Sequence, residues 1–107
     1  MKEVLILEDK SETRKVLAGL VKEVHSDAVI YEAADEKTAY DIAMKRTIDL
    51  FLVDIILHPQ QHDDVSGGEF AQNIRKVDKY LFTPILIITS MYDPKMCMYS
   101  SVHLSLI

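Results

Sequence analysis

Residues 4–9 read VLILED, and residues 50–54 read LFLVD. Each stretch is a short apolar run that ends in acid, with Glu8 and Asp9 in the first and Asp54 in the second. Continuous apolar runs of this length are typical of parallel strands covered on both faces. The carboxyl ends of neighbouring parallel strands lie at one edge of a sheet. The sequence therefore predicts that three carboxylates crowd into one crevice, where their repulsion calls for a cation.

Strands and helices alternate along the rest of the chain. Short aliphatic runs predict strands at 4–7, 28–31, 50–53 and 85–88, the last ending at Thr89 and Ser90. Apolar residues at helical spacing predict helices from residue 11 or 12 to about 24, from 36 to about 45, and from 68 to about 77. This alternation predicts an α/β fold, a doubly wound parallel sheet, in a single domain over residues 1–107.

Each predicted helix has an apolar face that should pack on the sheet. The expected inward residues are Val16, Leu17, Leu20, Val21 and Val24 in the first helix, Ala39, Ile42 and Ala43 in the second, and Phe70, Ala71, Ile74 and Val77 in the third. The last stretch is expected to form a short helix from Asp93 to about Ser100 and a fifth strand at 102–107. A complete sheet of this kind needs a further covering helix of about 10–14 residues. One face should therefore be under-covered, and we expect a homodimer, an exchanged segment, or a longer parent protein.

Composition excludes several classes of function. The 107 residues have a formal net charge of −5, which disfavours nonspecific binding of nucleic acid or anionic membrane. No apolar stretch approaches the roughly 20 residues of a membrane span, and the N-terminus lacks a signal-peptide pattern. Cys97 is the single cysteine, so no internal disulfide can form, and a cytoplasmic location is expected.

The chemistry of the predicted crevice is that of phosphoryl transfer. Mg²⁺ prefers oxygen ligands, commonly one or two carboxylates with waters and phosphate oxygens. Beside such an ion, Asp54 could attack phosphorus, and a hydroxyl at Thr89 could bond a phosphoryl oxygen. A single acid at a strand end is more often a helix cap or a solvated loop residue. It is the joint occurrence of Glu8, Asp9, Asp54 and Thr89 that favours a functional site.

On these residues the chain resembles the receiver domain of two-component response regulators, which has a flavodoxin-like fold. The matching pieces are residues 4–9, Asp54 after its strand, Ser66-Gly67 before the third helix, residues 84–90, and the alanines at 33, 34 and 39. The resemblance extends to about residue 100. It implies a strand order of 2-1-3-4-5 and a signalling domain rather than a turnover enzyme.

The resemblance also implies a role for each site residue. Asp54 would accept a phosphoryl group from the phosphohistidine of a sensor histidine kinase. Asp9 would bind Mg²⁺ directly, Glu8 would bind it through water, and Asp54 and the backbone carbonyl of Ile56 would complete the protein ligands. Thr89 would be the switch hydroxyl that moves toward the phosphoryl group. An output domain in a longer parent protein would be a further partner.

Three departures from the family keep an alternative open. The family's lysine at the end of strand five has no counterpart before Ile107, and Lys95 comes too early. The switch aromatic has no clear counterpart either, with His103 nearby, and the fifth helix is absent. The alternative is a pseudo-receiver that binds a partner protein without phosphorylation. A metal-dependent phosphotransfer enzyme of another α/β family is disfavoured, because an Asp-x-Asp pair is missing at both strand ends.

The connection after Asp54 is longer than is usual in that family. Residues 58–64 read HPQQHDD, and their histidines and aspartates have the chemistry of transition-metal ligands. A polar loop beside the crevice, which gates access or contacts a kinase, is the favoured interpretation.

Overall fold

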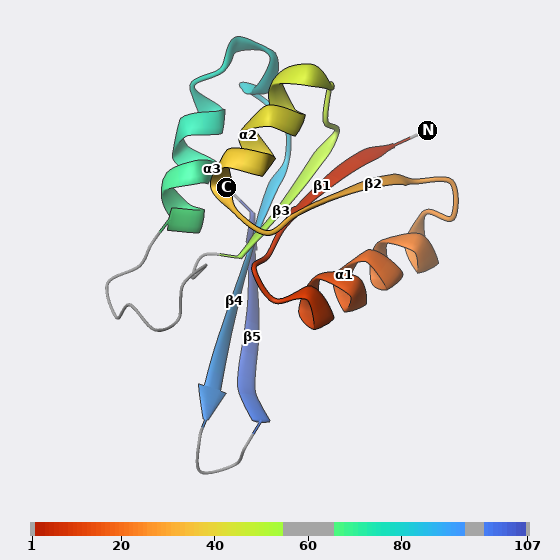
Figure 1. The fold of residues 1–107 in the computed structure, drawn as a ribbon, viewed down its shortest axis with the longest axis vertical. Coiled ribbons are helices and arrows are strands. Elements are labelled where there is room, and N and C mark those ends of the chain that lie inside the picture. The colour runs from red at the N-terminus through yellow and green to blue at the C-terminus, as the bar shows by residue number, and fades with distance from the viewer. Residues whose placement is uncertain (1, 55–65, 94–97, 107) are drawn as a thin grey trace.

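The computed structural model describes residues 2–54, 66–93 and 98–106 (Figure 1). The elements in chain order are β1 (Glu3–Leu7), α1 (Ser11–Val24), β2 (Val29–Ala33), α2 (Glu36–Lys45), β3 (Leu50–Asp54), α3 (Ser66–Arg75), the 3-10 helix η1 (Asp78–Tyr80), β4 (Ile85–Asp93) and β5 (Met98–Leu106). The strands form one sheet in the order β2-β1-β3-β4-β5. The pairs β1–β2, β1–β3 and β3–β4 are parallel, which confirms the predicted α/β class and strand order.

The C-terminal part differs from its prediction. β4 continues past Ser90 to Asp93, and β5 begins at Met98, where a helix was expected to end. β5 runs antiparallel to β4, with Ile88 opposite Leu104 and a register shift at Met91/Tyr92. Only residues 94–97 separate the two strands, and a crossover to a parallel strand needs a dozen or more residues. The fifth strand is thus in the expected place but in the opposite direction.

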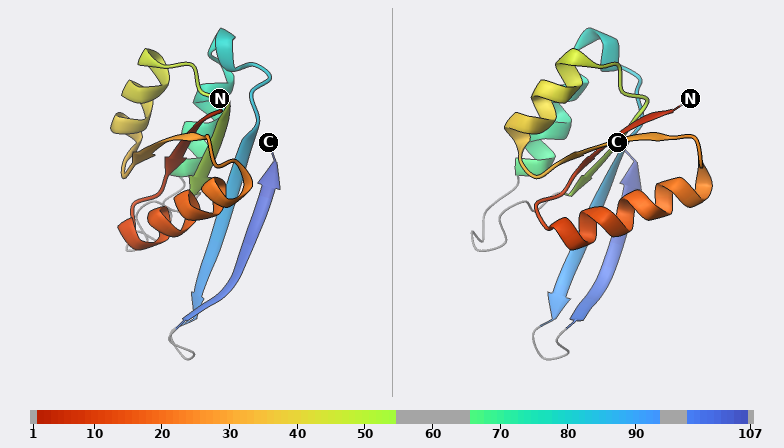
Figure 2. Two further views of the ribbon diagram at one scale, coloured as in Figure 1. Left: turned by 90° about the vertical axis from the view of Figure 1, so that its right-hand side faces the viewer. Right: turned by 45° about the vertical axis from the view of Figure 1, so that its right-hand side comes forward.

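One face of the sheet is well covered. α2, α3 and η1 pack on this face, whereas α1 lies on the other (Figure 2). The covered face buries one large apolar cluster, in which Phe51 contacts Phe70 and Tyr80 edge-on, with ring centroids 6.1 and 5.0 Å apart. The predicted inward residues Ala39, Ala43, Phe70, Ala71 and Ile74 are all buried there, and Ile42 and Val77 are partly buried.

The opposite face has a smaller core. Among the described residues α1 is the helix that covers it, through Leu17, Ala18 and Val21, which are all partly buried. The prediction of a fully inward apolar face on α1 was wrong for three residues: Val16, Leu20 and Val24 are 62%, 52% and 76% exposed. They lie at i, i+4 and i+8, a stripe turned away from the sheet. A single helix offers the sheet only a narrow strip, so part of its apolar surface stays in water.

Tyr80 joins η1 to the segment between α2 and β3. Its hydroxyl lies 2.6 Å from the carbonyl oxygen of Ala43 and 2.7 Å from that of Arg46, and it accepts the Ile48 N–H at 3.2 Å. The side chain is fully buried. A buried hydroxyl with these partners satisfies backbone groups that would otherwise be left without a hydrogen bond.

We predict that Tyr80→Phe lowers the free energy of unfolding by about 1–3 kcal/mol, because the Ile48 N–H loses its buried acceptor. Urea denaturation measures the change. Tyr40→Phe is the matched control, since its hydroxyl accepts an exposed bond from Asn73 at 3.0 Å, and removing it should cost no more than about 0.5 kcal/mol. Equal losses of unfolding free energy in the two variants would contradict a stabilising role for the buried Tyr80 hydroxyl.

Candidate functional site: a buried carboxylate cluster

The register of β1 and β3 brings the predicted acids together. Leu7 lies opposite Val53, so Glu8 leaves β1 at the same edge at which Asp54 ends β3. Asp9 follows Glu8 in the connection to α1. Carboxylate oxygens of Glu8, Asp9 and Asp54 all lie within 4.8 Å of one another. The three predicted carboxylates therefore cluster at the carboxyl edge of the sheet.

Two of the three carboxylates are almost inaccessible to solvent. Glu8 is 2% exposed and Asp54 is 6% exposed. Burial raises the pKa of Glu8 from 4.5 to about 9, and a hydrogen bond and the charge of Asp54 add to the rise. The Lys10 N–H, 3.1 Å from Glu8 Oε1, opposes it only in part. In the absence of a cation, Glu8 therefore holds a proton at neutral pH and shares it with Asp54.

The cluster fits a hard divalent cation. Asp9 Oδ1 is buried and has no hydrogen-bond partner among the described residues. A buried carboxylate oxygen without a partner is costly unless a donor or a cation occupies the space before it. Among the described residues the cluster offers three oxygen donors and no nitrogen or sulfur ligand, and such a set suits Mg²⁺ better than a transition metal.

The start of α1 holds the acidic connection in place. The Arg14 guanidinium donates from Nη1 to the Glu8 backbone oxygen at 2.7 Å and from Nε to Glu32 Oε1 at 3.0 Å. The Arg14 side chain is 16% exposed, so this ion pair is more shielded than a typical surface pair. Sequence reasoning missed Arg14; the available signal was a basic residue one turn into the helix that follows the acids.

Some predicted residues can be placed only in part. Thr89 follows Ile88, which lies opposite Asp54, and in the sheet Thr89 lies opposite His103. Thr89 thus lies one residue beyond the level of Asp54, within β4 rather than at its end. Ile56, Lys95, Cys97 and the loop 58–64 lie outside the described residues.

Comparison with known proteins identifies the family. The family model described as "Response regulator receiver domain" matches residues 4–100. The chain belongs to the response regulator receiver domain family. Receiver domains are signalling domains of two-component systems, not enzymes in the classical sense. Comparison with curated proteins gave no match.

Solved receiver structures share the fold. The chemotaxis response regulator CheY4 of Vibrio cholerae is 27% identical, with a TM-score of 0.70, and the match covers 90% of this receiver chain and 74% of that one. The receiver domain of merR from Colwellia psychrerythraea 34H has a TM-score of 0.72 at 17% identity, with the same coverage. MaeR bound to beryllium trifluoride has a TM-score of 0.69 at 23% identity and covers 90% of this chain and 73% of its own. None of the helices described in this receiver has the length and apolar character to span a membrane.

We predict that Glu8→Gln stabilises the receiver when divalent cations are chelated. The raised pKa means that native Glu8 keeps a proton which the unfolded chain loses above about 4.5, so stability falls as pH rises from there toward 9. The neutral amide removes this dependence, and a gain of about 1–3 kcal/mol is expected at pH 8. Thermal unfolding at pH 5, 7 and 9 in EDTA tests it.

The control is Asp41→Asn, which neutralises an exposed carboxylate on α2 and should leave the pH profile of the parent unchanged. A Glu8→Gln profile that runs parallel to the parent profile would show that Glu8 does not titrate as described.

Proposed function

We propose that this receiver is a phosphoacceptor module in which Asp54 takes a phosphoryl group in a Mg²⁺-dependent reaction. The observation that supports it best is the buried cluster of Glu8, Asp9 and Asp54, with an unpartnered oxygen on Asp9. Three carboxylates this close repel one another, which would destabilise a purely structural core. The same arrangement binds a hard cation strongly. We also propose that residues 1–107 form a single receiver domain.

Each residue of the site would have its own role in metal binding or phosphoryl transfer. Asp9 and Asp54 would bind Mg²⁺ directly and Glu8 through water, with the Ile56 carbonyl as a further ligand. The bound ion would neutralise charge on the incoming phosphoryl oxygens. Glu8 would first release its proton to water as the cation binds, which frees the Asp54 oxygen to which that proton is hydrogen-bonded. An Asp54 oxygen then bonds to phosphorus as the bond from phosphorus to the donor nitrogen breaks, and that nitrogen keeps the electron pair. Thr89 would donate its hydroxyl to a phosphoryl oxygen.

The donor and location are proposed from family membership. The phosphoryl donor would be the phosphohistidine of a sensor histidine kinase in the cytoplasm, and an output domain or a second receiver would read the phosphorylated state. We propose neither nucleic acid nor membrane as a partner of this segment. Phosphorylation would act by shifting a population between two conformations near Thr89.

A pseudo-receiver is the second candidate. Residues 102–107 read VHLSLI and include no lysine that could pair with a phosphoryl group. A receiver without such a cation would stabilise the aspartyl phosphate less and couple it less to a conformational change. In this alternative the fold binds a protein partner without covalent modification.

We predict that acetyl phosphate with Mg²⁺ adds about 80 Da to the intact protein, one phosphoryl group. The adduct should be lost in alkali, because an acyl phosphate hydrolyses readily, and it should be absent in EDTA. Asp54→Asn removes the nucleophile and should abolish labelling, while Asp41→Asn should label like the parent. A folded parent that shows no adduct would favour the pseudo-receiver.

We predict that Mg²⁺ stabilises the folded chain through the same cluster. At 100 times the dissociation constant, a ligand specific for the native state adds about 2.7 kcal/mol to the free energy of unfolding. Asp9→Asn should lose most of this gain, because it removes the negative charge of the side chain and replaces one carboxylate oxygen with an amide NH₂ group that cannot bind a cation. Asp41→Asn should keep it. Unfolding monitored by circular dichroism over a Mg²⁺ titration measures both, and an unchanged gain in Asp9→Asn would place the ion elsewhere.

A further inference from the structure

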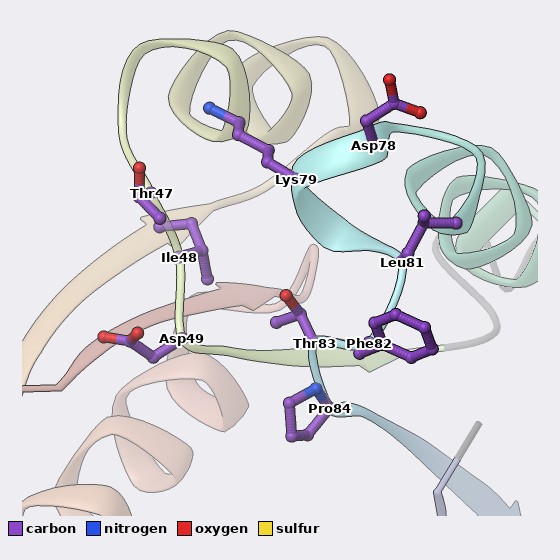
Figure 3. Close-up of a pocket in the computed structure, with 9 residues that line it drawn as sticks. All are labelled: Thr47, Ile48, Asp49, Asp78, Lys79, Leu81, Phe82, Thr83 and Pro84. Atoms are coloured by element: carbon purple, nitrogen blue, oxygen red, sulfur yellow. The ribbon is translucent and has the colours of Figure 1, made fainter.

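The amino edge of the sheet, opposite the carboxylates, carries a hollow lined by both polar and apolar residues. It has a volume of about 410 Å³ and lies between residues 47–49, which lead into β3, and residues 78–84, which lead into β4 (Figure 3). Leu81 and Phe82 flank it and are 48% and 94% exposed. Scattered apolar residues at a surface are ordinary, but two neighbours beside a hollow form a patch.

The loop that presents Phe82 is held rigidly. Arg75 Nη1 donates to the carbonyl oxygens of Tyr80, Leu81 and Thr83, at 2.9, 3.1 and 2.7 Å. Tyr80 fixes the start of the loop by its buried hydroxyl, and the proline at 84 restricts the backbone before it. The exposed Phe82 therefore sits on ordered backbone. A side chain of this kind loses little conformational entropy when a partner covers it.

The charge around the hollow is acidic. The Lys79 ammonium lies 2.9 Å from the Arg46 carbonyl oxygen and 3.5 Å from that of Met44, so it points to the end of α2 (Figure 3). Asp49 accepts the Glu3 N–H at 2.8 Å through one oxygen, which leaves acceptor capacity on the other. The exposed Asp78 adds a second carboxylate to the rim. The rim thus carries two carboxylates and one ammonium, a net charge of −1, and the ammonium is already hydrogen-bonded to the end of α2.

We propose that this surface docks a protein segment in which one apolar side chain is flanked by lysine or arginine. The apolar side chain would enter the hollow and contact Phe82 and Leu81, and the basic residues would pair with Asp49 and Asp78. An aromatic anchor beside a pocket with a polar rim is the usual anatomy of an interaction hot spot. The net charge of −5 favours encounter with such a partner.

This proposal goes beyond the phosphoacceptor function and is independent of it. The hollow and the carboxylate cluster lie at opposite ends of β3, since Asp49 precedes the strand and Asp54 ends it. A partner at the hollow leaves the crevice accessible. The two sites can therefore be tested separately on the same protein.

The test is selection from a random peptide library displayed on phage, with the immobilised full chain as bait and Phe82→Ser as counter-bait. We expect enriched peptides that contain an apolar residue flanked by lysine or arginine. Synthetic copies should bind the parent and lose about tenfold or more in affinity for Phe82→Ser. Asp78→Asn should weaken them less and reduce the salt dependence of binding.

The matched control is Val16→Ser, which removes an exposed apolar side chain of α1 on a different surface and should bind like the parent. Labelling of Asp54 by acetyl phosphate should be the same in Phe82→Ser as in the parent, so failure of one proposal is distinguishable from failure of the other. The docking proposal is overturned if no peptide depends on Phe82 or if the enriched peptides are acidic. It is also overturned if sedimentation shows a parent dimer that Phe82→Ser dissociates, because the surface is then a self-contact.

Discussion

The parallel pairing of β1 with β3 is the constraint on which the rest of this receiver depends. Leu7 opposite Val53 places Glu8, which follows β1, beside Asp54, the last residue of β3. The same pairing turns Leu5, Leu7, Phe51 and Val53 to the face that α2 and α3 cover. A shift of one residue in β1 would turn Leu5 and Leu7 to the face of α1, and Val4 and Ile6 to the face of α2 and α3. The core thus enforces the register, and the register brings the carboxylates together against their mutual repulsion.

That arrangement places an electrostatic cost inside the most stable part of the molecule. Glu8 and Asp54 are nearly as buried as the aliphatic side chains beside them, although water would solvate both far better. The raised pKa of Glu8 follows directly, because protonation is the remaining way to reduce the cost when no cation is bound. Sites that bind strongly often retain such an unfavourable arrangement in the free protein. The apolar packing on the face of α2 and α3 tolerates it.

The sequence predicted those parts of the fold in which a short pattern has one physical solution. The apolar runs into Glu8 and Asp54 could only be buried strands, and their shared edge followed from parallel pairing. The direction of β5 was missed, since Asp93-Pro94 also suits the start of a helix; the deciding constraint is the short link to Met98. The exposure of Val16 and Val24 was missed because helical spacing shows which residues share one side of a helix. It does not show whether another element packs against that side.

Contacts between distant segments were beyond prediction. Nothing local marks Tyr80 as the acceptor for the Ile48 N–H, or Arg75 as the donor to three carbonyls of the following loop. Arg14 donates hydrogen bonds both to Glu8, which follows β1, and to Glu32, which lies in β2. These two acceptors come close together only in the folded sheet. The proposed roles of Asp54 and Thr89 in phosphoryl transfer rest on family resemblance together with geometry.

The uneven cover of the sheet has a consequence for how the molecule fluctuates. α1 has no fully buried residue, so detaching it exposes less apolar surface than detaching α2 or α3. The connection that contains Asp9 leads straight into this helix. Partial opening of α1 would therefore hydrate the carboxylates while the sheet stays intact. A cation held by Asp9 would slow that opening and tie the most loosely attached helix to the ionic state of the site.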